Sequence, residues 1–545
     1  MNLPTATWGG RALPIMRSEA HFGDRIVRCF VRRPPSLDRM FRASTARHPA
    51  RDAVIHEGAR WSYAQLSDAV DRTAAGLQAS DIERGDRVAM LIGNRPAFIV
   101  ALLAIQRLRA IAVPISIREQ APGIAYMLGQ CGARMLIHDK ELAERLPKQS
   151  DLPAGLQRVS LGVGSIWHQW QQAKHASGLR GAADEGSEGG PEEGSEEDTA
   201  VILYTSGTTG RPKGAMLSHL NIVHSALHYE FCMALTGEDR SAMAVPASHV
   251  TGLVGMIMAM LQVGGAIVIV SSFKARSFLE LAAAHRITHT ILVPAMYQLC
   301  LLDPDFASFD LGAWRIGAYG GAPMPRSTIE ALAGKLPRMT LMNAYGATET
   351  SSPATIMPAG QQADHLASVG QPVPAADIRV MDEAGREVPA GTSGELWIGG
   401  PMVVAGYWDD PQASAAAFTG GCWRSGDIGS IDTDGYVQVL DRKKDMLNRG
   451  GYKIYSVEVE NVLLACEWVL EAAVVGRPCP VLGERVHAVV SVTGAMAADV
   501  SACETRLRVH CAGSLADYKV PETWVIQSDP LPRNANGKLM KRALR

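Results

Sequence analysis

Apolar, strand-like segments alternate with helical segments along most of this chain. Residues 88–92 and 111–114 are short apolar runs, and residues 96–107 between them have the period of a helix. Strands that alternate with helices indicate a mostly parallel sheet with helices on its faces. We therefore predict an α/β fold for the larger part of the chain.

The 545 residues are too many for one ordinary core, and the pattern changes along them. Residues 1–35 have no clear period and are expected to form an irregular N-terminal extension. From 36 to 440 we expect a large N-terminal domain of parallel sheets flanked by helices, which ends in a β-subdomain of short strands from about residue 368. A run of five charged residues, 441–445, suits a hinge. We expect a small mobile α+β domain at 441–545.

Residues 181–198 differ from the rest of the chain, because they hold eight Asp/Glu, five Gly and no Lys or Arg. No core can form from such a composition, so we predict a solvated, disordered acidic loop. An acidic segment that binds a partner is the alternative.

Composition excludes several classes of function. The formal net charge is −2, with 47% apolar and 20% charged residues, which describes a globular protein without a field for nucleic acid or anionic lipid. Nine cysteines include no pair at two-residue spacing, which argues against a zinc site and fits a reducing compartment. The N-terminus does not resemble a secretory signal. We expect a cytoplasmic protein.

One apolar stretch, residues 252–270, has the length of a membrane span. Gly264 and Gly265 divide it into a helix-length piece and a β-branched run at 266–270. We therefore predict a buried helix followed by a core strand, and no transmembrane segment.

A loop rich in glycine and hydroxyl side chains follows the apolar run at 200–203. Its sequence, residues 204–214, is Tyr-Thr-Ser-Gly-Thr-Thr-Gly-Arg-Pro-Lys-Gly. Glycines let backbone N–H groups approach a ligand, and hydroxyls and a lysine add donors for phosphate oxygens. The spacing is not that of the common P-loop, and an ordinary surface loop is the alternative. We predict a polyphosphate site.

Two further apolar strands end in polar turns. Residues 315–319 precede the turn at 320–323, and residues 340–343 precede the turn at 344–350. Ligands of open α/β sheets gather outside the carboxyl ends of strands, so these turns and the glycine-rich loop are expected to converge on one site.

These motifs together resemble those of the adenylate-forming (AMP-binding) acyl-CoA synthetase superfamily, of the fatty or aryl acid–CoA ligase type. Residues 204–214 match its phosphate loop, residues 345–349 (Tyr-Gly-Ala-Thr-Glu) its adenine motif, and residues 423–427 (Trp-Arg-Ser-Gly-Asp) its ribose motif. Residues 532–538 (Pro-Arg-Asn-Ala-Asn-Gly-Lys) match its C-terminal lysine motif, with Asn534 in place of threonine. The resemblance extends from about residue 36 to the C-terminus.

The resemblance implies a role for each matching position. Tyr345 is expected to stack on adenine, Thr348 to touch the α-phosphate, and Glu349 to bind Mg²⁺, although Glu349 could instead cap a helix. Asp427 and Arg442 are expected to contact the ribose. The full set implied to bind ATP or AMP is Thr205, Ser206, Gly207, Thr208, Thr209, Gly210, Lys213, Gly321, Ala322, Pro323, Asn343, Ala344, Tyr345, Gly346, Asp427 and Arg442.

The C-terminal region supplies the remaining expected roles. By the resemblance, Lys538 is the catalytic lysine that bridges the substrate carboxylate and the phosphate. Lys444 falls at the hinge, and Gly450, Gly451 and Tyr452 line a tunnel for the pantetheine arm. Asp441 stands where the family has glycine, which leaves the backbone geometry of the hinge entrance open.

The resemblance implies ligation of a carboxylic acid to coenzyme A through an acyl-adenylate, with ATP and Mg²⁺. The alternatives are a ligase that transfers its acyl group to a carrier-protein pantetheine, an amino-acid adenylation domain, a luciferase-like oxidase and an inactive scaffold.

His249 matches a gating position of the acyl pocket, or is a core histidine. The expected pocket wall, residues 249–256 and 320–324, is apolar and favours a fatty or aryl acid. Expected partners are small molecules, with a homodimer left open.

Overall fold

The structure is a computed structural model that describes residues 7–173, 194–205, 211–533 and 539–545. Two compact units divide the chain. Unit 1 comprises residues 1–322, 332–378 and 398–423, and unit 2 comprises residues 323–331, 379–397 and 424–545. The predicted site residues Ser206, Gly207, Thr208, Thr209, Gly210 and Lys538 lie outside the described residues.

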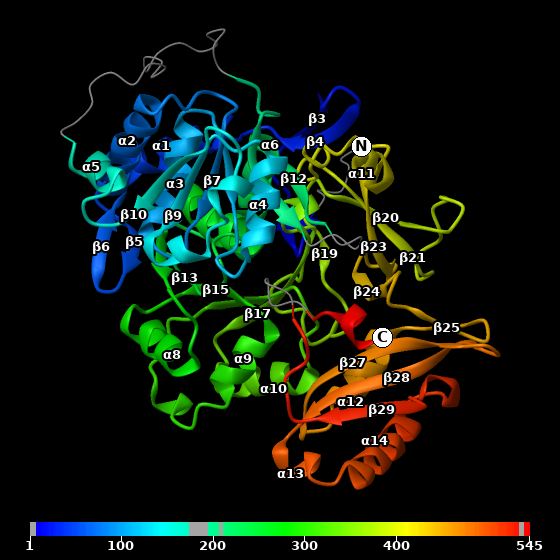
Figure 1. The fold of residues 1–545 in the computed structure, drawn as a ribbon. Coiled ribbons are helices and arrows are strands. Elements are labelled where there is room, and N and C mark those ends of the chain that lie inside the picture. Colours follow the sequence, from blue (N-terminus) through cyan, green and yellow to red (C-terminus); the bar gives the residue numbers. More distant parts are fainter. Residues whose placement is uncertain (1–6, 174–193, 206–210, 534–538) are drawn as a thin grey trace. The chain divides into compact units, whose positions relative to one another are not determined.

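Unit 1 is built on two sheets that are parallel through their centres (Figure 1). The first has the strand order β10-β9-β7-β8-β11-β12, and only its last pair is antiparallel. The α/β fold predicted from the alternating pattern is confirmed. The strands are β7 (Arg87–Leu91), β8 (Ile111–Pro114), β9 (Met135–Asp139), β10 (Gln157–Leu161), β11 (Thr199–Thr205) and β12 (Lys213–Ser218).

The second sheet has nine strands in the order β19-β18-β17-β16-β15-β13-β14-β5-β6. Six neighbouring strands in its centre run parallel, and antiparallel strands lie at both edges. The strands are β5 (Asp52–His56), β6 (Ala59–Ser62), β13 (Arg240–Met243), β14 (Ala266–Ile269), β15 (His289–Leu292), β16 (Ile316–Tyr319), β17 (Thr340–Tyr345), β18 (Thr355–Ile356) and β19 (Gln371–Pro372).

One apolar core joins side chains from helices α1, α2, α3 and α6 to those of both sheets. Local signals set the helix ends: Ser36 and Ser218 accept the capping hydrogen bonds of α1 and α6, and a proline opens α3. The helices are α1 (Leu37–Arg47), α2 (Tyr63–Ala79), α3 (Pro96–Arg107), α4 (Ala121–Gln130), α5 (Ile166–Gln172), α6 (His219–Met233), α7 (Ala259–Val263), α8 (Ala275–Ala284), α9 (Pro294–Leu301), α10 (Arg326–Lys335) and α11 (Pro411–Ala417).

The apolar stretch 252–270 forms a buried π-helical segment (Thr251–Met258), the helix α7 and the central strand β14. Gly264 ends α7 with a φ of +76°, a conformation that glycine adopts without strain. Among the described residues, no helix is long and apolar enough to cross a membrane.

The N-terminal region is more regular than its sequence indicates. Strands β1 (Thr7–Trp8) and β2 (Arg11–Ala12) form one hairpin, and β3 (Met16–His21) and β4 (Arg25–Phe30) form another. The interpretation as an irregular extension therefore fails for residues 7–30, because both hairpins rest on long-range contacts. Trp8, for example, is buried and donates to the carbonyl of Pro372 at 2.9 Å.

The end of the acidic segment is also ordered by distant partners. Glu196 pairs with Arg33 at 2.7 Å, and Asp198 pairs with Arg84 at 2.8 Å. The expectation of a solvated loop over 181–198 does not hold for these residues. Composition alone does not predict that Arg33 and Arg84, which are distant in sequence, form ion pairs with these carboxylates.

Strands β20 (Asp377–Met381), β21 (Gly394–Gly399), β22 (Phe418–Thr419), β23 (Cys422–Ile431) and β24 (Val437–Arg442) form a third sheet. It corresponds to the predicted stretch of short strands.

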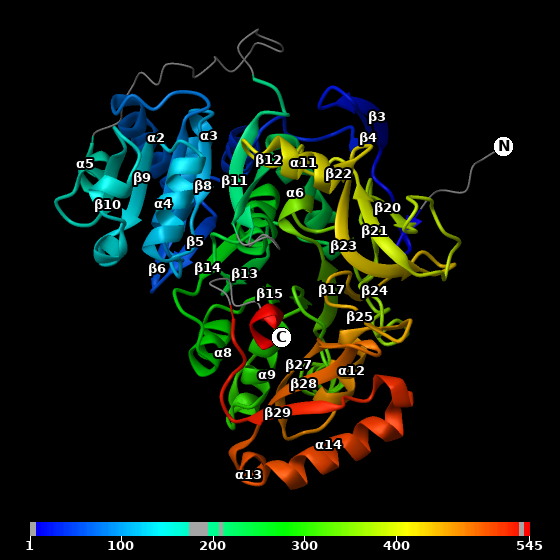
Figure 2. The same ribbon diagram turned by 45° about the vertical axis from the view of Figure 1, so that its right-hand side comes forward.

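The last sheet lies in unit 2 and has the order β26-β25-β28-β27, with β29 beside β28. Helices α12 and α14 pack against it and against each other (Figure 2). The elements are β25 (Leu447–Arg449), β26 (Tyr452–Ile454), α12 (Ser456–Leu464), β27 (Val469–Cys479), β28 (Gly483–Val492), α13 (Gly494–Ala497), α14 (Val500–Ser514) and β29 (Thr523–Gln527).

Candidate functional site

Lys213 begins a strand that the sequence did not reveal. β11 and β12 are antiparallel, with Thr205 opposite Lys213, so the glycine-rich loop connects the two strands of a hairpin. Gly214 is required in β12, because a Cβ atom there would lie 2.7 Å from the side chain of Ile202. The hairpin fixes Lys213 at the base of the predicted phosphate loop.

Glu349 lies in a short 3₁₀ turn at Thr348–Thr350 and is 8% exposed. The hydroxyl of Tyr407 donates to its Oε1 at 2.9 Å, and the ammonium of Lys213 lies 5.1 Å from the centre of the Tyr407 ring. Burial, and then the nearby Glu349 carboxylate, raise the pKa of Tyr407, so that its hydroxyl stays protonated. Tyr407 thus contacts two predicted site residues, although no sequence motif identifies it.

Backbone pairing holds Tyr407 in this place. Trp408 donates its N–H to the carbonyl of Gly214 at 2.7 Å, and Met216 donates to Gly406 at 3.1 Å. Tyr407 therefore forms an isolated antiparallel bridge with Ala215 of β12. Val404 donates to the carbonyl of Glu349 at 3.0 Å. No local motif signals these pairings.

The turns after β16 and β17 lie together. The strands are parallel neighbours, with Tyr319 opposite Asn343. A Cβ atom on Gly320 would lie 2.4 Å from the carbonyl oxygen of Ala344, so the two turns touch. Strand β17 continues through Tyr345, two residues further than the sequence indicates, because Ala344 and Tyr345 pair with β18.

The remaining predicted residues of these turns are placed as follows. Gly321 has a φ of +78°, which favours glycine, and Ala322 follows it as the last residue of that part of unit 1. Gly346 and Thr348 continue from β17 toward Glu349. Pro323 is grouped with unit 2.

His249 is exposed, two residues before the π-helical segment. The alternative of a buried core histidine is therefore wrong. Asn94 holds the preceding residues: its side-chain NH₂ donates to the carbonyls of Val245 at 3.0 Å and Val270 at 3.2 Å, and its Oδ1 accepts from the N–H of Ala247 at 2.8 Å.

Asn94 thereby ties together the ends of three strands from two sheets. It follows β7, Val245 follows β13, and Val270 follows β14. No sequence pattern identifies Asn94 as a functional residue, because an asparagine after a strand is ordinary in a loop.

In unit 2, Asp427 and Arg442 face each other across β23 and β24, and Arg442 Nε lies 2.6 Å from Asp427 Oδ1. Asp427 is 2% exposed, and its N–H donates to the hydroxyl of Ser425 at 3.0 Å. The structure therefore brings together the two residues expected to contact the ribose.

Asp441 has a structural role where the family has glycine. It is 2% exposed and does not adopt a positive φ, so this backbone does not require glycine. Its carboxylate accepts from the backbone N–H of Ser456 and, at 3.0 Å, from the Ser456 hydroxyl. Burial raises the pKa of Asp441, against the opposing charge of Lys541.

Lys444 is exposed in the turn after β24, and its carbonyl accepts from Arg545 at 2.7 Å. Gly450 and Gly451 have φ values of 59° and 90° and form the two-residue turn between β25 and β26, a hairpin turn that favours glycine at both positions. Tyr452 is 60% exposed and stacks on Tyr518, with ring centres 4.6 Å apart.

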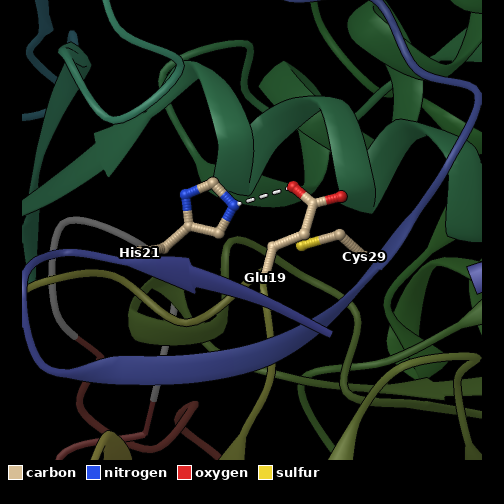
Figure 3. A group of neighbouring side chains, drawn as sticks. All are labelled: Glu19, His21 and Cys29. Atoms are coloured by element: carbon tan, nitrogen blue, oxygen red, sulfur yellow. Dashed lines mark hydrogen bonds and ion pairs between the residues drawn. The ribbon is translucent and has the colours of Figure 1, made fainter. Parts of the chain in front are cut away.

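A different cluster brings metal-ligand types together in the N-terminal hairpin. Glu19, His21 and Cys29 have donor atoms within 4.8 Å of one another (Figure 3). Arg33 already supplies a cation there, because its guanidinium pairs with Glu19 at 2.6 Å, and this hydrogen bond lowers the pKa of Glu19. Burial raises the pKa of Cys29 to about 12, which favours the thiol over a ligating thiolate.

We interpret this cluster as an ion-pair network. His21 Nδ1 lies 2.9 Å from Glu197, and Arg33 also pairs with Glu196. The network ties the β3–β4 hairpin to the residues that precede β11.

Family models match most of the chain. Residues 41–408 match the model described as AMP-binding enzyme, and residues 458–538 match the model described as AMP-binding enzyme C-terminal domain.

Several known proteins are similar over nearly their whole length. A feruloyl-CoA synthase of Amycolatopsis sp is 34% identical over 91% of this chain and 96% of the relative. The long-chain-fatty-acid–CoA ligase FadD13 of Mycobacterium tuberculosis is 31% identical over 89% and 93%. The structure of o-succinylbenzoate CoA synthetase (MenE) of Bacillus subtilis with ATP and magnesium ion has a TM-score of 0.80 and 27% identity, covering 93% of this chain and 98% of that one.

Proposed function

The chain belongs to the AMP-binding enzyme family, and on this premise we propose that it joins a fatty or aryl acid to coenzyme A with ATP. In the first step a carboxylate oxygen attacks the α-phosphorus of ATP, and the bond to pyrophosphate breaks. In the second step the thiol sulfur attacks the acyl carbon of the acyl-adenylate and loses its proton, and AMP leaves with the electrons of the broken C–O bond.

The observation that carries this proposal is the contact of Lys213, Tyr407 and Glu349. The Lys213 ammonium lies 5.1 Å from the centre of the buried Tyr407 ring, and the Glu349 carboxylate accepts from the Tyr407 hydroxyl at 2.9 Å. Lys213 supplies positive charge for phosphate oxygens and Glu349 supplies a hard oxygen ligand. Tyr407 fixes the direction of the Glu349 carboxylate through its hydroxyl.

The residues fit a magnesium ion that is held largely by the nucleotide. Mg²⁺ uses one or two protein carboxylates when phosphates and waters supply its other ligands, and Glu349 is such a carboxylate, nearly buried. The bound ion would neutralise charge on the phosphates during attack by an anion. Thr348 and Tyr345 are the proposed contacts to the α-phosphate and adenine.

Unit 2 carries the other proposed contacts. Asp427 and Arg442 present a carboxylate and a guanidinium to the ribose, and Lys538 supplies a cation between the substrate carboxylate and the phosphate. We propose that residues 441–545 rotate about Lys444 between the two steps, so that Gly450, Gly451 and Tyr452 then line the path of the thiol.

The acid is proposed to bind beside the π-helical segment. Residues 250 and 252–256 are buried and apolar, and His249 is exposed before them, as a gate at a pocket entrance requires. Asn94 anchors this segment from the neighbouring sheet. A wall of this kind favours an apolar acid over a charged one.

A panel of fatty and aryl acids, scored by AMP release with and without coenzyme A, tests the function. Release that depends on coenzyme A supports the ligase, whereas acyl-adenylate that forms and reacts only with a carrier-protein pantetheine supports that alternative. Oxygen consumption with light emission would indicate the luciferase-like alternative.

Lys538→Ala tests the catalytic lysine in the same assay. We expect loss of acyl-adenylate formation, while thioester synthesis from supplied acyl-AMP is largely retained, because the lysine stabilises charge in the first step only. Equal loss of both steps would remove this assignment.

Location and assembly belong to the same proposal. A cytoplasmic location is supported by nine cysteines that are all free thiols, and cell fractionation tests it. A homodimer stays a prediction that sedimentation velocity can test.

A further inference from the structure

An arginine of the N-terminal β3–β4 hairpin contacts a segment that is almost 380 residues away in sequence. Arg25 is the first residue of β4, directly after the turn of the hairpin. Its guanidinium donates to three successive backbone carbonyls: Val404 at 2.9 Å, Ala405 at 3.0 Å and Val403 at 3.4 Å. All four residues belong to unit 1. One side chain of the hairpin therefore holds the backbone of residues 403–405.

The guanidinium of Arg25 is withdrawn from water. The Arg25 side chain is 8% exposed, and its guanidinium carbon lies 5.3 Å from the centre of the Phe22 ring and 5.9 Å from that of Phe418. A guanidinium keeps its charge when it is buried, so it needs acceptors there. The carbonyls supply them, and hydrogen bonds from a charged donor are stronger than those between neutral groups.

The contacted segment depends on such partners. Residues 401–406 lie outside any helix or strand, so their backbone groups are not paired within a regular element. Asn221 of α6 donates to the carbonyls of Pro401 at 2.7 Å and Val403 at 3.1 Å. Arg25 and Asn221 share the carbonyl of Val403, so the two side chains fix this part of the segment together.

The same segment holds Glu349 at two points. Val404, whose carbonyl accepts from Arg25, donates its own N–H to the carbonyl of Glu349 at 3.0 Å. Three residues later, the hydroxyl of Tyr407 donates to the Glu349 carboxylate at 2.9 Å. A displacement of residues 403–405 would therefore disturb both the backbone and the carboxylate of Glu349.

We infer that Arg25 is a positioning residue for Glu349, because it fixes the segment whose Val404 and Tyr407 hold that glutamate. The inference rests on the proposed function, in which Glu349 binds Mg²⁺. It gives the β3–β4 hairpin a part in acyl-adenylate formation, although the resemblance to the superfamily begins only at about residue 36.

Arg25→Met tests the inference, because methionine keeps an apolar stem between the two rings but donates no hydrogen bond. With the acid that releases most AMP in the panel, ATP–pyrophosphate exchange should fall by about tenfold. The magnesium concentration needed for half-maximal exchange should rise, since groups that orient a metal ligand contribute about 10-fold to 100-fold to metal affinity or activity. Thioester synthesis from supplied acyl-AMP should stay within about twofold of wild type, because Glu349 serves the first step.

Arg25→Lys is the conservative variant. Lysine keeps the charge but lacks the planar fork that reaches several carbonyls at once, so both readouts should lie between those of Arg25→Met and the wild type. If Arg25→Met does not fold, Arg25→Lys carries the test. A wild-type magnesium requirement in Arg25→Lys would then overturn the inference.

A matched control separates positioning from stability. Arg145 also donates to backbone carbonyls within unit 1, those of Ile117 at 2.7 Å and Glu119 at 3.0 Å, which lie between β8 and α4. Arg145→Met removes these bonds and should leave exchange and its magnesium dependence near wild type. Urea unfolding of both variants measures the stability that each loses. Equal changes of magnesium dependence in Arg145→Met and Arg25→Met would overturn the inference. So would a loss of stability in Arg25→Met with wild-type magnesium dependence.

Glu349→Gln, measured in parallel, distinguishes the two possible failures. If Glu349→Gln retains exchange with wild-type magnesium dependence, the proposed role of Glu349 fails, and the inference fails with it. If Glu349→Gln loses exchange while Arg25→Met keeps the wild-type magnesium dependence, only the inference fails.

Discussion

The hydroxyl of Tyr407 donates a 2.9 Å hydrogen bond to Glu349, although 58 residues separate the two in sequence. The Glu349 carboxylate therefore has a fixed donor before any ligand binds. The ammonium of Lys213 lies 5.1 Å from the centre of the Tyr407 ring.

Tyr407→Phe should lower acyl-adenylate formation by about tenfold, because loss of one hydrogen bond to a buried carboxylate costs about 1.5–3 kcal/mol, of which part affects the bound state. The magnesium concentration needed for half-maximal exchange should rise. Pyrophosphate exchange measured over a magnesium series checks both effects.

Tyr63→Phe is the control for Tyr407→Phe. Tyr63 is fully buried in unit 1, and its hydroxyl donates to the carbonyl of Gly265 at 2.8 Å. Its loss should reduce stability without changing the magnesium dependence. A Tyr407→Phe enzyme with wild-type magnesium dependence would show that Tyr407 does not orient Glu349.

Asn94→Ala should raise the KM for the acid by about tenfold, or about 1.4 kcal/mol, while the KM for ATP stays within about twofold. The amide fixes the residues before His249, so its loss frees one wall of the proposed acid pocket. Steady-state kinetics with each substrate varied in turn check this split. A parallel rise in both KM values would contradict it.

Two deletions should differ in their effect on stability. Removing residues 184–193 should leave activity and unfolding nearly unchanged, because a shorter acidic segment changes the closure entropy only slightly. Removing 184–197 also takes away Glu196 and Glu197, the partners of Arg33 and His21, and should cost on the order of 1–3 kcal/mol.

Urea unfolding of both deletion variants measures this difference. Equal stability of the two variants would show that the ion pairs of the N-terminal hairpin contribute nothing. A large loss of activity in the shorter deletion, with the fold intact, would show that the acidic segment takes part in the reaction.

Glu460 should make the stability of the protein depend on pH. Burial raises its pKa from 4.5 to about 7, against the opposing charge of Lys541. The folded state therefore holds the proton more tightly than the unfolded state. The resulting contribution is fully present below pH 4.5 and is lost as the pH rises through about 7.

Glu460→Gln removes this titration. The free energy of unfolding of the wild type, minus that of Glu460→Gln, should fall between pH 4.5 and 7 and then level off. Asp441 also interacts with the charge of Lys541, and burial raises its pKa too, so Asp441→Asn tests its share of the slope. Glu458→Gln on the same helix is the control for a general effect of removing a carboxylate. Parallel wild-type and Glu460→Gln profiles over this range would contradict the prediction.

Lys444→Pro should allow acyl-adenylate formation and block thioester synthesis, if residues 441–545 are held in the adenylating orientation. Proline fixes its own φ at about −65° and restricts the backbone of the residue before it. Both effects remove the backbone rotation that a hinge needs. Separate assays of the two half-reactions check this outcome.

Lys444→Ala removes the same charge without stiffening the backbone and should affect both steps mildly. Thioester synthesis at the wild-type rate in Lys444→Pro would place the hinge elsewhere.

The sequence by itself determined the class of fold and the positions of the motifs. Helix α3 has the predicted bounds, Pro96–Arg107, and Ser36 and Ser218 cap the helices that follow them. These features depend on residues a few positions apart, so periodicity and capping signals report them. The convergence of the turns after β16 and β17 was predicted from a general rule of α/β folds, because neighbouring parallel strands place their carboxyl ends on one edge of the sheet.

Tertiary structure alone decided which side chains support the motif residues. Tyr407 reaches Glu349, Asn94 reaches the segment before His249, and Lys541 reaches Glu460 across separations that leave no periodic pattern. The sequence pattern did not predict strand β12, because its antiparallel pairing with β11 is what makes it a strand. Glu196 and Asp198 have a composition typical of solvated loops, yet they are ordered by arginines far away in sequence. Such contacts depend on how the chain folds back on itself, and neighbouring residues do not encode them.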